Sequence, residues 1–126
     1  MTDLSVENLT LRAGDTTLVD DASFKLAQGE FVALLGPNGA GKTSLIRAGI
    51  GLQSADEGRS LLDGTPVHGL SPAQRARQIA YLPQIRPLAW PNAVRDVVSL
   101  GRFSHGAPLG RLKGLDAEAV HRALEA

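Results

Sequence analysis

Residues 36–43 read Gly-Pro-Asn-Gly-Ala-Gly-Lys-Thr and fit the phosphate-binding pattern G-x-x-x-x-G-K-[ST] with no deviation. Gly36 and Gly41 allow the backbone to turn tightly and to bring amide N–H groups close to phosphate oxygens. Lys42 supplies a cation for the β- and γ-phosphates, and the Thr43 hydroxyl can ligate Mg²⁺. A helix that begins here would place the positive end of its dipole at the same phosphates. The pattern therefore predicts that the chain binds a nucleoside triphosphate.

The predicted site covers the whole motif, which we call the phosphate loop. Thr43 is the expected magnesium ligand, and Ser44 lies next to it on the first helical turn. The residues expected to surround the phosphates are Gly36, Pro37, Asn38, Gly39, Ala40, Gly41 and Lys42.

The segments on either side of the loop fit this interpretation. Phe31–Leu35 is a continuous apolar run, which is typical of a strand buried on both faces of a parallel sheet. After the loop, a short helix is predicted, which Gly49 and Gly51 weaken or end. Its apolar positions are Leu45, Ile46, Ile50 and Leu52.

Two strands with alternating apolar residues precede this core. The alternation in Leu4–Leu11 slips at Glu7-Asn8, which predicts a bulge. A turn at Gly14-Asp15 leads to a strand with Ala22, Phe24 and Leu26 on one face. This pattern predicts an antiparallel flap beside a parallel sheet.

The remaining elements are short. Strands are predicted at Ser60–Gly64 and at Ile79–Pro83, and helices are predicted after Ser71-Pro72, over Val94–Leu100 and after Asp116. Ser71 and Asp116 are the expected N-caps of the first and last of these helices.

Bulk properties exclude several classes of function. The chain has 126 residues, with 13 Lys and Arg against 13 Asp and Glu, so no net charge recruits nucleic acid. It has no cysteine, which excludes disulfides and thiolate metal sites. The N-terminus has no secretory pattern, and the longest apolar run is too short to span a bilayer. A cytoplasmic location is therefore expected.

These motifs together resemble the N-terminal half of the ATPase subunit of an ATP-binding cassette (ABC) transporter. The likeness covers essentially the whole chain and is specific once the glutamine motif is included. It rests on Asp21-Ala22-Ser23-Phe24, Gly29-Glu30, Leu34–Thr43, Asp63-Gly64 and Tyr81-Leu82-Pro83-Gln84. The resemblance implies that Gln84 reaches toward Mg²⁺ and the attacking water, and that Lys42 and Gln84 serve catalysis with ATP and Mg²⁺ as cofactors. It also implies that Gln84 links the catalytic core to the helical subdomain.

The resemblance also implies an architecture and partners. The fold expected is an α/β P-loop core with an antiparallel flap over residues 1–83, then a glutamine loop and the start of a helical subdomain over residues 84–126. The partners implied are membrane permease subunits and a second ATPase subunit on the inner face of a bacterial membrane, with no direct contact to cargo. Segments Val94–Phe103 and Leu109–Leu112 are similar to importers of iron–siderophore complexes, haem or cobalamin.

The chain departs from the family pattern in two ways. Arg12-Ala13-Gly14 stands where an aromatic residue usually stacks on adenine, and Arg12 is a candidate for a cation–π contact instead. No apolar run ending in Asp-Glu follows Gln84, and the Ser-Gly-Gly signature and the switch histidine are also absent. We therefore expect an unpaired sheet edge beside Phe31–Leu35, which would favour association.

Other interpretations remain open. A non-catalytic module that binds ATP would explain the missing motifs. A P-loop kinase would need an acceptor site and a GTPase would need an Asn-Lys-x-Asp segment, and neither is visible in this sequence. Trp90 could equally anchor a permease helix or pack beneath a loop. Solvent-exposed roles are expected for His68, His105, His121, Arg75 and Arg77.

Overall fold

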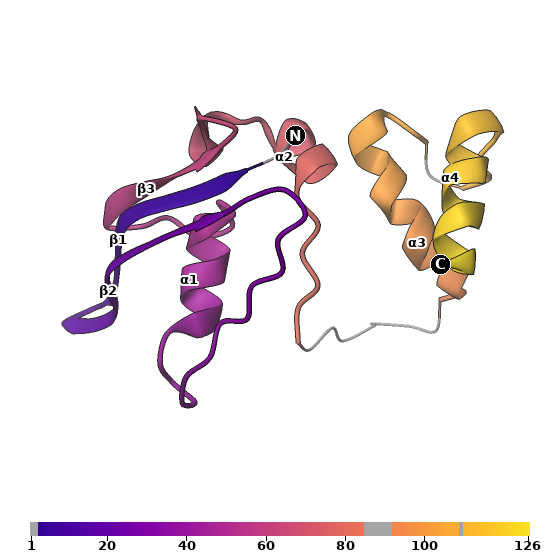
Figure 1. The fold of residues 1–126 in the computed structure, drawn as a ribbon. Coiled ribbons are helices and arrows are strands. Elements are labelled where there is room, and N and C mark those ends of the chain that lie inside the picture. The colour runs from indigo at the N-terminus through magenta and orange to yellow at the C-terminus, as the bar shows by residue number, and fades with distance from the viewer. Residues whose placement is uncertain (1–2, 85–91, 109) are drawn as a thin grey trace. The chain divides into compact units, whose positions relative to one another are not determined.

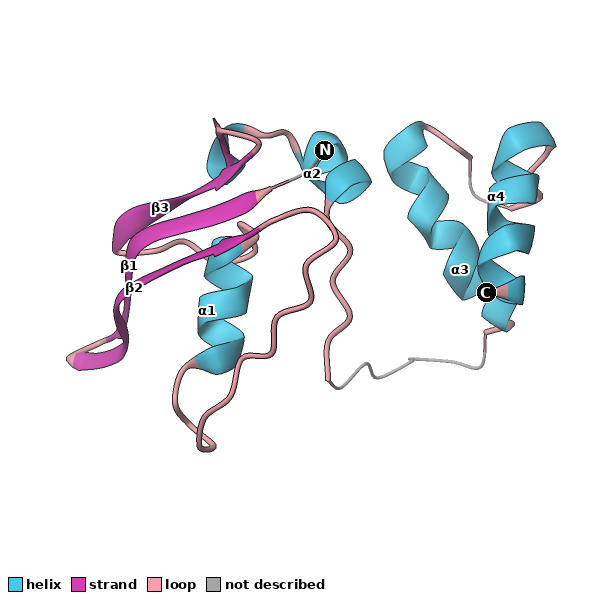
Figure 2. Ribbon diagram, in the orientation of Figure 1, coloured by secondary structure: helices cyan, strands magenta, loops and turns pink. Residues whose placement is uncertain are grey.

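The computed structural model describes residues 3–84, 92–108 and 110–126. The chain divides into two compact units, Met1–Ser71 and Pro72–Ala126, and each is described here by itself. Figure 1 shows the path of the chain through both units, and Figure 2 shows that the strands lie in the first. The predicted division at residues 83 and 84 concerns the family's subdomains and stays a prediction.

The first unit is built on an antiparallel sheet of four strands. These are β1 (Leu4–Ala13), β2 (Thr16–Leu26), β3 (Glu57–Leu62) and β4 (Thr65–Pro66), in the spatial order β2-β1-β3-β4. The predicted turn at Gly14-Asp15 joins β1 to β2, so the expected antiparallel flap is confirmed. The predicted strand at Ser60 begins earlier, at Glu57, and a short 3₁₀ helix, Val67–Gly69, follows β4.

The predicted bulge at Glu7-Asn8 is present and has a matching irregularity on β2. The register shifts between Val6 and Leu9, and Asn8 and Asp21 have positive φ angles of 49° and 48°. Asn8 Nδ2 donates a 2.8 Å hydrogen bond to Asp21 Oδ1, so the two left-handed residues face each other across the strands. Asparagine and aspartate tolerate this conformation better than other residues with side chains.

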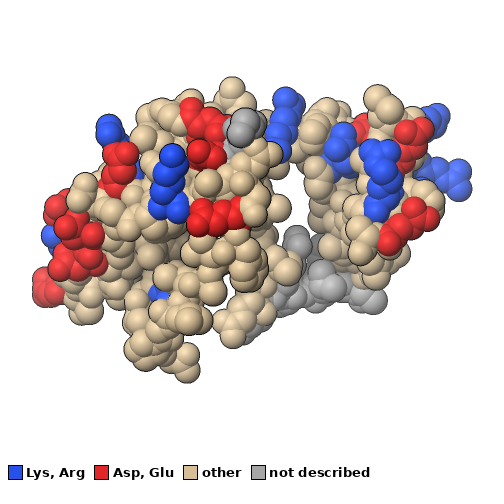
Figure 3. Space-filling view, viewed as in Figure 1, with Lys and Arg blue, Asp and Glu red and all other residues tan. Residues whose placement is uncertain are grey.

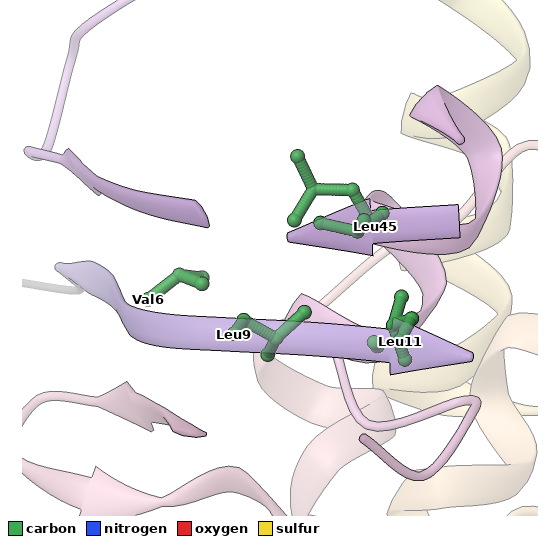
Figure 4. Packing of buried hydrophobic residues seen from close by; sticks show 6 residues of the cluster. Val6, Leu9, Leu11 and Leu45 are labelled. Atoms are coloured by element: carbon green, nitrogen blue, oxygen red, sulfur yellow. The ribbon is translucent and has the colours of Figure 1, made fainter. Parts of the chain in front are cut away.

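The core lies between the sheet and helix α1 (Lys42–Gly49). Leu9 and Leu11 of β1 are each 1% exposed and pack with Leu45 of α1 (Figure 4). Burial of such a side chain contributes about 1.5–3 kcal/mol. The helix ends as predicted at its glycines: Gly51 N donates to Ala48 O, and Leu52 N donates to Arg47 O, which is the Schellman pattern.

Two sequence predictions were wrong. Phe31–Leu35 and Ile79–Pro83 form no strand in the described structure, and Phe31, Leu35 and Leu82 are 93%, 86% and 84% exposed. A strand of a parallel sheet exists only through hydrogen bonds to its neighbours, and no described strand pairs with either segment. The parallel part of the predicted core is therefore not formed by the described residues.

The second unit consists of short helices. They are α2 (Pro72–Gln78), α3 (Val94–Ser99), a 3₁₀ helix at Leu100–His105, and α4 (Gly114–Glu125). Arg102 Nε donates a 2.7 Å hydrogen bond to Asp116 Oδ1 in the first turn of α4. Asp116 is thus not the N-cap that the sequence predicted, because the helix begins two residues earlier and Lys113 occupies that position.

Two further sequence predictions concern a membrane span and a membrane partner. None of the helices in the described part of the chain combines the length and apolar character needed to cross a lipid bilayer. Trp90 and Pro91 lie outside the described residues, so the predicted anchor at Trp90 stays a prediction.

Candidate functional site: an exposed phosphate loop

The phosphate loop folds around its own lysine. Lys42 Nζ donates hydrogen bonds of 2.8 Å to the Gly36 carbonyl and 2.6 Å to the Pro37 carbonyl. Ala40 N donates to Pro37 O at 3.3 Å, which closes a turn at the tip. Residues 36–40 are all exposed. The ammonium group therefore lies within an open loop, where an anion can reach it and the surrounding backbone.

Left-handed glycines give the loop its shape. Gly39 has φ 83°, and Gly41 has φ 78° and forms the N-cap of α1. Such angles are costly for any residue that carries a Cβ, so the sequence needs glycine here. Leu45 N donates a 2.8 Å hydrogen bond to Gly41 O, so the helix starts directly at the end of the loop. The first amides of α1 therefore point toward the loop, as an anion site requires.

The charge around the loop also favours an anion. Residues 31–55 contain Lys42 and Arg47 and no Asp or Glu, although Met1–Ser71 holds nine acidic residues against five basic ones. The first turn of α1 has no acidic side chain. Figure 3 shows no Asp or Glu, which are drawn in red, on the visible face around the loop and the lower part of α1. Phosphates that approach the loop meet no nearby carboxylate in this segment.

The magnesium ligand predicted from the sequence is available. Thr43 lies on the first turn of α1, is exposed, and forms no side-chain hydrogen bond with the described residues. Ser44 is half-buried beside it. A hydroxyl oxygen next to bound phosphates is a donor that suits Mg²⁺. The residues present therefore fit a nucleotide carrying Mg²⁺.

Gln84 lies in the second unit, at an exposed bend. The structure brings Lys42, Thr43 and the loop glycines together, and it does so within the first unit alone. The role of Gln84 beside Mg²⁺ and water stays a prediction.

The residues around the loop do not indicate what the loop packs against. A Cβ on Gly41 would lie 2.2 Å from the Leu18 carbonyl oxygen and 3.0 Å from Val19 Cγ2. The end of the loop therefore touches β2 directly. The apolar pair Leu18-Val19 in an alternating strand indicates a buried contact, but the pattern does not indicate that this contact is with Gly41.

Arg12 has a partner of its own. Arg12 Nη2 donates a 2.7 Å hydrogen bond to Glu57 Oε1, and the backbone N–H of Arg12 donates to Asp56 Oδ2. Its hydrogen bond to the Glu57 carboxylate raises the pKa of the Arg12 guanidinium. Among the histidines, His121 lies 3.2 Å from Glu125 one turn along α4. The described residues contain no cluster of three or more metal-ligating side chains.

A glycine-rich loop that leads into a helix packed on a sheet is the nucleotide-binding element of mixed α/β phosphate-loop domains. Comparison with known families agrees. The family model described as ABC transporter matches residues 19–125, so the chain belongs to the ABC transporter family, as the N-terminal part of its ATP-binding domain.

Curated relatives refine the placement within this family. The hemin import ATP-binding protein HmuV of Pseudomonas putida is 41% identical over 123 residues, which are 98% of this chain and 47% of the relative. The iron(3+)-hydroxamate import ATP-binding protein FhuC of Bacillus subtilis is 33% identical, over 99% of this chain and 46% of the relative. The cobalamin import ATP-binding protein BtuD of Halobacterium salinarum is 37% identical, over 96% and 30%. The chain spans less than half the length of these relatives.

A solved structure is also similar. It is described as the ATP-binding subunit of an ABC transporter, with a TM-score of 0.71 and 30% sequence identity over 83% of this chain and 43% of that one. The similarity supports a mixed α/β architecture with an antiparallel sheet as part of the family domain.

Proposed function

We propose that this chain is the nucleotide-binding part of an ABC import ATPase, which binds ATP with Mg²⁺ through residues 36–44. The observation that carries the proposal is the position of Lys42 Nζ, 2.8 Å from Gly36 O and 2.6 Å from Pro37 O at the N-terminus of α1. The exposed loop, the locally basic segment and the family match support it.

Each group has a distinct part in binding. Lys42 would neutralise the β- and γ-phosphates, and the loop amides would donate hydrogen bonds to their oxygens. Thr43 would hold Mg²⁺, which shields phosphate charge when it is bound. An arriving phosphate competes with the Gly36 and Pro37 carbonyls for the lysine. Affinity therefore reflects the difference between these two sets of contacts.

The relatives support a proposal for the cargo and the partners. Their printed names concern import of hemin, iron(3+)-hydroxamate and cobalamin. We extend import of an iron complex or cobalamin to this chain, together with membrane permease subunits and a second ATPase copy as partners. In this proposal the protein acts at the inner face of the cell membrane and does not itself touch the cargo.

The test is titration of the protein with MgATP by calorimetry. The wild-type protein should bind, and Lys42→Ala should abolish tight binding because the loop loses its cation. Lys25→Ala is the matched control: Lys25 is an exposed lysine in the same unit, on β2, and pairs with Asp3 at 3.7 Å. It should bind like wild type. Wild-type protein that does not bind, or Lys42→Ala that binds equally well, overturns the proposal.

A further inference from the structure

Gly41 is the glycine of the phosphate loop that touches the sheet. A Cβ at Gly39 would meet no atom within 4 Å, and one at Gly36 would meet only Ala40 and Lys42 of the loop itself. A Cβ at Gly41 would instead meet the Leu18 carbonyl oxygen at 2.2 Å and Val19 Cγ2 at 3.0 Å. The loop is therefore in contact with β2 at its C-terminal end.

Val19 connects this contact to the core. It is 9% exposed and belongs to the same buried cluster as Leu11 and Leu45. Leu11 is its partner across the β1–β2 ladder. Leu45 lies on the first turn of α1 and donates its N–H to Gly41 O. One side chain thus packs against the end of the loop and belongs to the cluster that fixes α1.

The N-terminal end of the loop is held by Lys42 of the loop itself and has no comparable contact with the sheet. Residues 30–36 belong to no strand, and Phe31 and Leu35 are almost fully exposed. The position of the loop within this unit therefore depends on its C-terminal contacts. A loop held in its binding conformation before the ligand arrives loses less conformational entropy on binding.

We propose that Val19, together with the Leu18 backbone, is a positioning residue for phosphate binding: it holds Gly41 in the left-handed conformation from which α1 begins. The inference rests on the proposed function, because it concerns the same site. Val19 acts through Gly41 and does not touch the nucleotide. Removal of its two γ-methyl groups leaves a void beside Gly41, into which the loop can relax.

The test compares Val19→Ala with Val6→Ala. Both valines lie in the same cluster, and each touches a glycine of the loop–helix segment: Val19 touches Gly41 before α1 begins, and Val6 lies 3.3 Å from a Cβ placed on Gly49 at its end. Both variants should melt at lower temperature. Only Val19→Ala should also weaken MgATP binding, by about tenfold, when measured well below both melting transitions.

The outcomes separate the two proposals. Wild-type protein that does not bind, or Lys42→Ala that binds normally, defeats the proposed function. If those controls behave as expected and the two valine variants change the affinity equally, or not at all, the positioning role of Val19 is wrong and the proposed function stands.

A second measurement applies if Val19→Ala does not fold. Hydrogen exchange of the wild-type protein should slow on addition of MgATP in a peptide covering residues 16–22 as well as in one covering 36–45. A peptide covering β3, residues 57–62, is the control and should not change. Exchange in residues 16–22 that is the same with and without MgATP would overturn the positioning role.

Discussion

Arg12 on β1 and Glu57 at the start of β3 form an ion pair, with 2.7 Å between Nη2 and Oε1. The sheet order is β2-β1-β3, and the phosphate loop contacts β2 through Gly41. The Arg12 guanidinium therefore bonds to β3, whereas the phosphate loop contacts β2, on the opposite side of β1. This arrangement competes with the cation–π role that the sequence allowed for Arg12.

Replacement of Arg12 by Ala should therefore leave the Kd for MgATP within about twofold of wild type, since an exposed ion pair contributes little and the loop is untouched. Glu57→Gln is the companion variant, because it releases the guanidinium from its carboxylate. Calorimetry measures both. A loss of affinity in Arg12→Ala, joined by a gain in Glu57→Gln, would show that Arg12 reaches the base.

Gly41→Ala should destabilise the fold more than Gly39→Ala. Both glycines have positive φ, so either substitution costs about 1–2 kcal/mol of backbone strain. At Gly41 the new methyl group would also lie 2.2 Å from Leu18 O, and overpacking adds about 1–3 kcal/mol. Urea unfolding of the two variants measures the difference. Equal losses would mean that the loop does not touch β2.

Ser60→Ala should raise the stability of the protein by about 1 kcal/mol. Ser60 is 2% exposed, and its hydroxyl has no hydrogen-bond partner among the described residues. Ser23→Ala is the control, because Ser23 Oγ accepts a 2.8 Å hydrogen bond from Asn8 N. That variant should lose about 0.5–1.5 kcal/mol. A destabilised Ser60→Ala would indicate that the hydroxyl has a partner.

Local patterns predicted the parts of the fold that depend on near neighbours. The bulge at Asn8, the turn at Gly14 and the end of α1 at its glycines depend on a few adjacent residues, and each was confirmed. The phosphate loop was predicted from eight residues, because glycine, lysine and hydroxyl groups at this fixed spacing are typical of phosphate binding. Its role in binding stays a prediction.

The remaining features depend on residues far apart in the sequence. Nothing in the sequence around Gly41 indicates that Val19 lies against it, because 22 positions separate them and the contact arises only when β2 packs beside α1. Asp116 looked like an N-cap, but Arg102 binds its carboxylate. Phe31–Leu35 has the composition of a buried strand, but composition does not supply the neighbouring strands.

The exposed run Phe31–Leu35 leads to a final prediction. Phe31 and Leu35 are 93% and 86% exposed, so the double variant Phe31→Asn, Leu35→Asn should change the free energy of unfolding by less than about 0.5 kcal/mol per site. It should also lower self-association, because exposed apolar side chains on a backbone with unpaired hydrogen-bonding groups favour association with other chains. Leu11→Asn is the control: Leu11 is 1% exposed, and this change should unfold the unit. Urea unfolding and sedimentation velocity measure the two effects. A double variant that unfolds as readily as Leu11→Asn would show that residues 31–35 are buried in solution, as the sequence predicted.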